Sequence, residues 1–274
     1  MLRIALCQLP LDIENPSENI SMAEAAIRES AASGAQLILL PELTNSGYVF
    51  QSKQEVAARA TKLDSPLMQR WSALVRELDI VLVVGLAIEE EGIFYNASAI
   101  FDASGLCGWY KKVHLWNDEV DFFTAGEDGP LIVETKVGKI ATMVCYDVEF
   151  PEWVRLAMLG GAAILAIPTN WPDGGLEIQD TPMEAVRIQA AASQNKMVIA
   201  AADRTGRERG VSWTSSSVLV DSDGLIKVIA ARNNLPERQI LIADVEIPSD
   251  LKVGPRNDIR GDRRPELYKK ILVK

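Results

Sequence analysis

Short apolar runs alternate with patterns of helical spacing along nearly the whole chain of 274 residues. The apolar runs predict strands at 2–9, 37–40, 80–88, 95–102, 108–115, 130–135, 137–145, 163–167, 197–203, 214–220, 225–231 and 238–245. Apolar residues three or four apart predict helices at 16–33, 66–78, 152–160 and 180–194. Because the two kinds of element intermix throughout, the pattern predicts an α/β protein with a mixed sheet layer, not separate all-α and all-β domains.

The composition is that of a globular protein, with 48% hydrophobic and 24% charged residues. No linker-like stretch interrupts the alternation, so one domain is expected over residues 1–274. Its last part, 248–274, is charged and lacks a strong period, which predicts a surface tail. No run reaches the roughly 18 apolar residues of a membrane span, and the N-terminal apolar run is too short for a secretory signal. Three widely spaced cysteines fit a reducing compartment, so a cytoplasmic location without membrane contact is expected.

Charge and motif content disfavour several classes of function. A formal net charge of -10 would repel a nucleic-acid backbone, so no nucleic-acid partner is expected. The single histidine and the lack of a Cys-x-x-Cys pair argue against a zinc site. No glycine-rich nucleotide motif occurs either. The sequence therefore predicts neither a metal nor a cofactor.

The segment around Cys145 is the strongest candidate for chemistry. An apolar run ends at this thiol and is followed by Tyr-Asp-Val-Glu-Phe-Pro-Glu, which predicts a turn into a helix near Pro151. A nucleophile at a strand-to-helix turn is a recurring catalytic device. A nearby helix amino terminus is expected to favour the thiolate over the thiol. Cys7 and Cys107 lack this setting and are interpreted as small structural residues.

Two further residues have side chains that suit acyl transfer. Glu42 follows the strand 37–40 directly after Pro41, and ligands of α/β sheets bind beyond such strand ends. Strand alternation over 109–116 would place Lys112, His114 and Trp116 on one face. Each has a simpler interpretation: Glu42 as a solvated carboxylate, Lys112 as an edge residue and His114 as a structural histidine. A hydrolase that uses Cys145 with His114 as its base stays open as an alternative.

Four motifs in order resemble those of the nitrilase superfamily of carbon-nitrogen hydrolases. They are Pro-Glu42-Leu-Thr-Asn-Ser-Gly-Tyr, Tyr-Lys-Lys112-Val-His-Leu, Phe-Phe-Thr-Ala-Gly126 and Val-Cys145-Tyr-Asp-Val-Glu-Phe-Pro-Glu. The resemblance extends from the first strand to about residue 245. It implies a four-layer α-β-β-α sandwich and a Glu-Lys-Cys triad at Glu42, Lys112 and Cys145. It also implies an auxiliary glutamate, best matched by Glu119.

The resemblance also implies a reaction and a set of neighbours for it. The thiol of Cys145 would attack an amide carbonyl, with Lys112 and the backbone N–H of Tyr146 stabilising the oxyanion. Glu42 would act as general base. The residues expected to contact the substrate are Tyr48, Tyr146, Asn170 and Trp171. Many relatives have Ala-Asn-Arg where this chain has Ala202-Asp203-Arg204, so different polar contacts are expected there.

The expected activity is release of ammonia from a small carboxamide, since Cys-Tyr-Asp resembles the amidase and carbamoyl-hydrolysing branches. A nitrilase, an N-carbamoyl hydrolase and a catalytically silent scaffold stay open as alternatives. Acidic residues in the loop after Asn170, namely Asp173, Glu177 and Asp180, would favour an amine-bearing substrate. Members of the superfamily commonly pair their sandwiches, so a homodimer or a higher homo-oligomer is expected, with 248–274 in the subunit contact.

Overall fold

Two six-stranded sheets stack face to face in the structure, a computed structural model that describes residues 1–174, 176–178, 181–231 and 238–272. The first sheet has the order β16-β1-β2-β3-β4-β5. Its strands are β1 (Leu2–Gln8), β2 (Leu37–Leu39), β3 (Val81–Glu90), β4 (Ile93–Asp102), β5 (Gly105–Lys111) and β16 (Gln239–Val245). β1, β2 and β3 are parallel, whereas β3, β4 and β5 form an antiparallel meander, as the short turns predict.

The second sheet has the order β15-β14-β11-β8-β7-β6. Its strands are β6 (Leu131–Thr135), β7 (Gly138–Thr142), β8 (Ile164–Pro168), β11 (Val198–Ala202), β14 (Val218–Val220) and β15 (Ile226–Ile229). β7, β8 and β11 are parallel and are joined through helices. Glu42 and Cys145 follow β2 and β7, parallel strands of the first and the second sheet, and ligands of α/β proteins bind beyond such strand ends.

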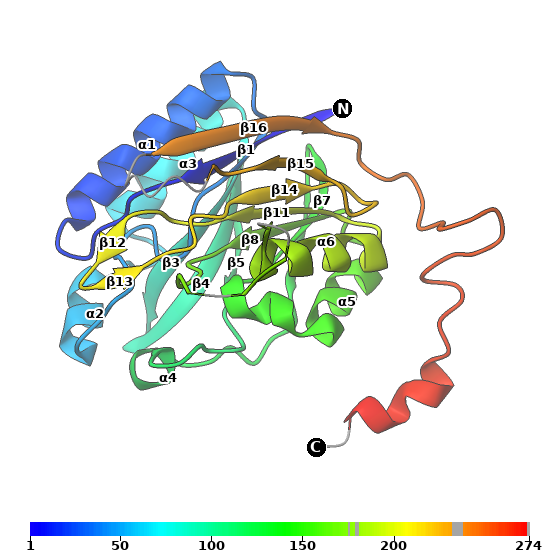
Figure 1. The fold of residues 1–274 in the computed structure, drawn as a ribbon. Coiled ribbons are helices and arrows are strands. Elements are labelled where there is room, and N and C mark those ends of the chain that lie inside the picture. Colours follow the sequence, from blue (N-terminus) through cyan, green and yellow to red (C-terminus); the bar gives the residue numbers. More distant parts are fainter. Residues whose placement is uncertain (175, 179–180, 232–237, 273–274) are drawn as a thin grey trace.

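Helices cover the outer face of each sheet (Figure 1). α1 (Pro16–Ala32) and α3 (Pro66–Leu78) pack on the first sheet, and α5 (Pro151–Leu159) and α6 (Met183–Asn195) pack on the second. Proline at the first turn of α1, α3 and α5 suits a position whose N–H has no partner within the helix. The four-layer α-β-β-α sandwich is thereby confirmed.

Three apolar clusters fill the three interfaces between these layers. One lies under α1 and α3, one under α5 and α6, and the third joins the two sheets. Ile4 and Leu39 of the first sheet share this central cluster with Ile164 and Ala200 of the second, and all four side chains are fully buried. Each large side chain buried in this way contributes about 1.5–3 kcal/mol, so the strands that carry the candidate residues are held rigidly.

Short elements occupy the connections. They are α2 (Lys53–Arg59), α4 (Glu119–Phe122), the 3₁₀ turn η1 (Cys145–Glu149), β9 (Glu177–Ile178), β10 (Thr181–Pro182), β12 (Arg207–Glu208), β13 (Val211–Ser212) and the 3₁₀ helix η2 (Pro265–Leu272). Beyond β16 the chain runs away from the sandwich and ends in η2 (Figure 1). No helix in the described ranges is long and apolar enough to cross a membrane.

Several predicted boundaries are wrong. The strand predicted over 108–115 ends at Lys111, so Lys112, His114 and Trp116 do not share a strand face. The chain turns there because Asp147 accepts the backbone N–H of His114 at 3.0 Å. The strand predicted over 137–145 ends at Thr142. The helix predicted over 180–194 begins at Met183, after β10, and residue 180 lies outside the described residues.

Candidate active site

Glu42 lies beyond the carboxyl end of β2, where the backbone is tightly confined. Its backbone N–H donates to the carbonyl of Thr169 in the other sheet's connection, at 3.4 Å, and its side chain is fully buried. Leu43 has a positive φ of 53°, so the chain bends sharply after the glutamate. The bend and the neighbouring strand β3 fix the carboxylate between the two sheets.

Lys112 follows β5 directly and is also fully buried. Its Nζ lies 2.8 Å from Oε1 of Glu42 and 2.8 Å from Oε1 of Glu119. Glu119 begins α4, and its second oxygen accepts the backbone N–H of Trp116 at 3.0 Å. A buried ammonium between two carboxylates satisfies the rule that buried charges are paired. The structure thus brings together Glu42, Lys112 and Glu119, as the sequence predicts.

Asn96 of β4 completes this cluster and was missed by the sequence analysis. Its Nδ2 donates to Oε1 of Glu42 at 2.6 Å and lies 3.4 Å from Oε1 of Glu119. Its backbone carbonyl accepts the N–H of Lys112 at 2.9 Å. Oε2 of Glu42 has no hydrogen-bond partner among the described residues. The glutamate therefore uses one oxygen for its fixed neighbours and leaves the other available for a proton.

Cys145 is the first residue of η1 and has a φ of 46°. A left-handed conformation is uncommon for a side chain of this kind and marks the sharp turn expected of a nucleophile between strand and helix. Asp147 stabilises the turn, because its Oδ2 accepts the Val144 N–H at 3.0 Å and the Tyr110 hydroxyl at 2.8 Å. The thiol is 7% exposed, and it accepts a hydrogen bond from the backbone N–H of Asn170.

The electrostatics of the site correct one expectation. Burial, with the negative charge of Glu42 next in importance, raises the pKa of the Cys145 thiol well above its usual range, although Lys112 opposes this. Burial also raises the pKa of Glu42 to about 7, against the opposing charge of Lys112. The prediction that a helix amino terminus favours the thiolate is therefore wrong in the free protein. A thiol that stays protonated needs a base, and a carboxylate with a pKa near neutrality is suited to that task.

The four residues predicted to contact substrate lie in different settings. Tyr48 donates its hydroxyl proton to Oε1 of Glu119 at 2.7 Å. Tyr146 packs edge-on against Trp116, with ring centroids 4.8 Å apart. Asn170 donates from Nδ2 to the Glu42 carbonyl at 3.0 Å, and its Oδ1 has no partner among the described residues.

Trp171 is buried, and its backbone N–H donates to Oδ1 of Asp203 at 3.0 Å. Asp203 is itself fully buried, and it also accepts the N–H groups of Arg204 and Ser216. Asp203 thus holds the segment around Trp171. Of the acidic residues predicted to favour an amine, Glu177 is exposed on β9 and Asp180 lies outside the described residues.

The remaining candidate residues have structural surroundings. Nδ1 of His114 lies 2.7 Å from Oδ1 of Asp147, and its ring stacks on Phe150 with centroids 3.7 Å apart. These contacts match the structural interpretation of this histidine. Cys7 is fully buried, and burial raises its pKa to about 12. Cys107 lies half-buried on β5. Within the described ranges no three His, Cys, Asp or Glu residues are grouped as a metal site would need.

This fold and this site define a class: an α-β-β-α hydrolase with a buried cysteine, glutamates and a lysine between two sheets. The family model for carbon-nitrogen hydrolases matches residues 3–249. The chain therefore belongs to the carbon-nitrogen hydrolase family, and the resemblance to the nitrilase superfamily is confirmed.

Relatives of different specificity match along most of their length. A nitrilase from Pyrococcus abyssi is 31% identical over 271 residues, which cover 98% of this chain and 99% of that protein. An N-carbamoylputrescine amidase from Arabidopsis thaliana is 30% identical over 276 residues, with 94% and 91% covered. Among solved structures, an amidase from Nesterenkonia sp. AN1 superimposes with a TM-score of 0.81 at 28% identity, over 99% of this chain and 100% of that chain. That structure shows acrylamide added to the active-site cysteine of a glutamate-to-glutamine mutant.

Proposed function

We propose that this carbon-nitrogen hydrolase cleaves a small carboxamide to a carboxylic acid and ammonia through a thioester on Cys145. The observation that carries the proposal is that the two carboxylate oxygens of Glu42 have different surroundings. Oε1 is held by Lys112 and Asn96, while the buried Oε2 has no partner among the described residues. A carboxylate oxygen kept free beside a protonated thiol is the arrangement that general-base catalysis needs.

In the first half of the reaction, the sulfur of Cys145 attacks the amide carbon while its proton passes to Oε2 of Glu42. The carbonyl oxygen becomes an oxyanion, and the ammonium of Lys112 and the backbone N–H of Tyr146 stabilise it. Glu42 then gives its proton to the amide nitrogen, the C–N bond breaks, and ammonia leaves. Glu119 holds Lys112 in place and accepts a hydrogen bond from the departing amine.

In the second half, water attacks the thioester carbon and gives a proton to Glu42. The C–S bond breaks, and the sulfur recovers a proton from Glu42, so the acid is released and the enzyme is restored. One base thus serves both halves. A positioned base typically contributes about 10² to 10⁴-fold, and a lost oxyanion donor costs about 10² to 10³-fold. Replacing Glu42, Lys112 or Cys145 should therefore nearly abolish turnover.

Three matched substrates separate the amidase proposal from its closest alternatives. Butyramide, butyronitrile and N-propylurea carry the same propyl group on an amide, a nitrile and a carbamoyl amine. Ammonia release should be fastest from butyramide and should vanish in Cys145→Ala. Faster release from the nitrile would make the protein a nitrilase, and faster release from the urea would make it an N-carbamoyl hydrolase. Comparing 4-aminobutyramide with succinamic acid tests the preference for an amine-bearing substrate.

A catalytically silent scaffold is the alternative from another class of function. Labelling with iodoacetamide distinguishes the two, because an activated thiol reacts faster than a buried inert one. Peptide mass analysis should show Cys145 alkylated well before Cys7. Equal, slow labelling of both cysteines would support the scaffold.

We propose further that the chain forms a homodimer and that the tail 248–274 takes part in the contact. The tail runs away from the sandwich (Figure 1), and the side chains of Val253, Leu267 and Ile271 are 56%, 64% and 63% exposed. Apolar side chains on an extended segment gain stability when a second copy covers them. Light scattering should give a dimer at micromolar concentration, and a chain ending at residue 247 should shift toward monomer. A full-length monomer would contradict this.

A further inference from the structure

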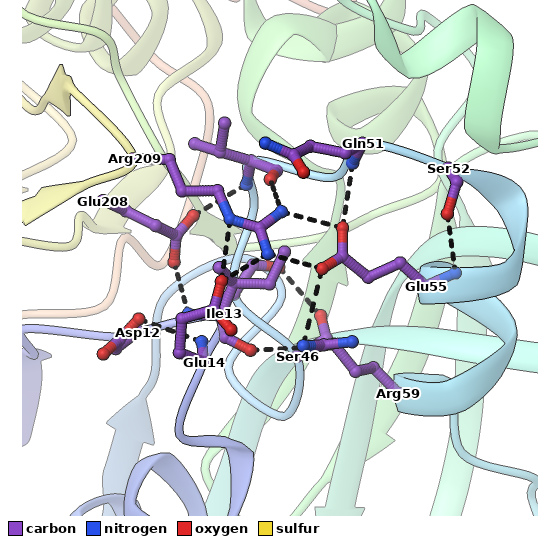
Figure 2. Close-up of polar contacts among 12 residues, drawn as sticks. Asp12, Ile13, Glu14, Ser46, Gln51, Ser52, Glu55, Arg59, Glu208 and Arg209 are labelled. Carbon is purple, nitrogen blue, oxygen red and sulfur yellow. Dashed lines mark hydrogen bonds and ion pairs between the residues drawn. The ribbon is translucent and has the colours of Figure 1, made fainter.

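One buried carboxylate, that of Glu208 on β12, accepts hydrogen bonds from the backbone of the loop that carries Tyr48. Oε2 of Glu208 accepts the backbone N–H of Tyr48 at 2.8 Å and that of Val49 at 2.7 Å. Oε1 accepts the backbone N–H of Ile13 at 2.8 Å. Figure 2 shows Glu208 between the segment of Ile13 and the loop. Three backbone N–H groups from two segments far apart in the sequence thus meet at this side chain.

The carboxylate is suited to this task because it only accepts hydrogen bonds, and its charge is balanced. Glu208 is 2% exposed, and Nη2 of Arg204 lies 3.1 Å from its Oε1. Breaking a buried ion pair by removing one partner leaves an uncompensated charge. The loop is confined further at Gly47, where φ is +79° and an added Cβ would lie 2.5 Å from the Cα of Ile13. The backbone of Tyr48 therefore has little room to move.

The other end of Tyr48 reaches the candidate active site. Its hydroxyl donates to Oε1 of Glu119 at 2.7 Å, and the same oxygen receives Nζ of Lys112 at 2.8 Å. Between the two ends, the ring packs edge-on against Trp213 with centroids 5.2 Å apart. The guanidinium of Arg204 lies over that indole, 4.5 Å from its centroid. The ion pair of Glu208 and Arg204 lies outside the cluster of Glu119 and Lys112. Tyr48 thus connects the two.

We propose that Glu208 is a positioning residue of the active site. It holds Tyr48 so that the tyrosine hydroxyl orients Glu119, and Glu119 in turn orients the ammonium of Lys112. This proposal rests on the proposed function, because it assigns Glu208 to the same reaction. It differs from a merely structural role in requiring that the effect of Glu208 on the site pass through the side chain of Tyr48.

A neighbouring cluster provides the matched control. Glu55 of α2 accepts the N–H of Gln51 at 2.8 Å and pairs with Arg209 at 2.6 Å, and Arg209 also binds the carbonyl of Val49 at 2.8 Å (Figure 2). Glu55 thus stabilises the same loop without accepting the N–H of Tyr48. Glu55→Gln should lower thermal stability and leave turnover unchanged.

The experiment compares Glu208→Gln, Tyr48→Phe and the double variant. For butyramide, Glu208→Gln should lower kcat/KM about 10- to 100-fold, the range expected for misplaced catalytic groups. The double variant should be no slower than Tyr48→Phe alone, because the two residues act in series. Multiplying effects, or an equal loss of turnover in Glu55→Gln, would overturn the proposal. If Glu208→Gln does not fold, Glu208→Asp keeps the charge for Arg204 while withdrawing the acceptor from the loop.

A second readout does not depend on turnover. The charge of Lys112 lowers the pKa of the Cys145 thiol, so loosening the ammonium should move the pH midpoint of iodoacetamide labelling upward. The midpoint should rise in Glu208→Gln and in Tyr48→Phe, and no further in the double variant. An unchanged midpoint in folded Glu208→Gln would refute the positioning role. A shifted midpoint in a protein that releases no ammonia from any substrate would instead refute the proposed function.

Discussion

The backbone of Glu42 passes so close to Gly85 of β3 that a Cβ atom at position 85 would lie 2.3 Å from the Cα of Glu42. The same Cβ would lie 2.7 Å from the carbonyl oxygen of Pro41, whose partner is the N–H of Gly85 itself at 3.1 Å. A glycine in the neighbouring strand is thus what allows the glutamate to sit where it meets Lys112.

Gly85→Ala should therefore inactivate the enzyme, although Gly85 lies on the neighbouring strand β3 and takes no part in the reaction. The backbone around Glu42 must shift to admit the methyl group, and displacing a catalytic group by about 1 Å can cost about 10²-fold in rate. We expect kcat/KM for butyramide to fall by at least that order. Gly129→Ala is the control, since an added Cβ there meets nothing within 4 Å. Near-normal activity in folded Gly85→Ala would show that the position of Glu42 does not matter.

The pH dependence of turnover should report the ionisation of Glu42. Its pKa is raised to about 7, so the fraction of base falls below that pH and kcat/KM should decline on the acid side. The hydrogen bond from Asn96 lowers this pKa, so Asn96→Ala should move the acid limb to higher pH. Ser98→Ala, two residues along β4, should leave the limb in place, because Ser98 contacts Thr142 at 2.6 Å instead. A limb that stays fixed in Asn96→Ala would assign the titration to another group.

Glu42→Gln should be inactive, and its stability relative to the wild type should increase as pH rises. Burial raises the pKa of this carboxyl from its ordinary value of 4.5 to about 7 in the folded protein, so the folded state binds the proton more tightly. The wild type therefore loses stability as pH rises from about 4.5 through about 7, whereas the glutamine variant does not lose this contribution. Between pH 5 and pH 8, urea denaturation should show the variant gaining on the order of 3 kcal/mol relative to the wild type. A stability difference that stays constant across this range would mean that the pKa of Glu42 is not raised in the folded protein.

Much of the fold follows from local patterns in the sequence. The alternation of apolar runs with helical spacing predicts the strands of both sheets and all four packed helices, since each buries one apolar face. α2 was not predicted because Lys53–Arg59 is a short, mostly polar segment with a single buried residue, Val56. The end of β5 at Lys111 was also missed, because it depends on Asp147, a residue remote in sequence that caps the turn after the strand.

Some residues of the candidate site could likewise be predicted from the sequence, and others could not. Glu42, Lys112 and Cys145 stand at the ends of apolar segments, within recognisable motifs, so the sequence alone points to them. Asn96 and Glu208 carry no such signal, because each acts on groups that only folding brings near. The protonation state of Cys145 likewise depends on burial between two sheets, which local sequence does not reveal. The helix dipole suggested a thiolate, whereas burial raises the pKa of the Cys145 thiol and keeps it protonated.

The thioester on Cys145 is tested most directly by partitioning it between water and hydroxylamine. Butyramide and ethyl butyrate differ in leaving group but would form the same butyryl thioester, so both should give the same ratio of butyrohydroxamic acid to butyric acid. Cys145→Ala should form neither product from either substrate. A ratio that changes with the leaving group, or products that persist in Cys145→Ala, would contradict the account.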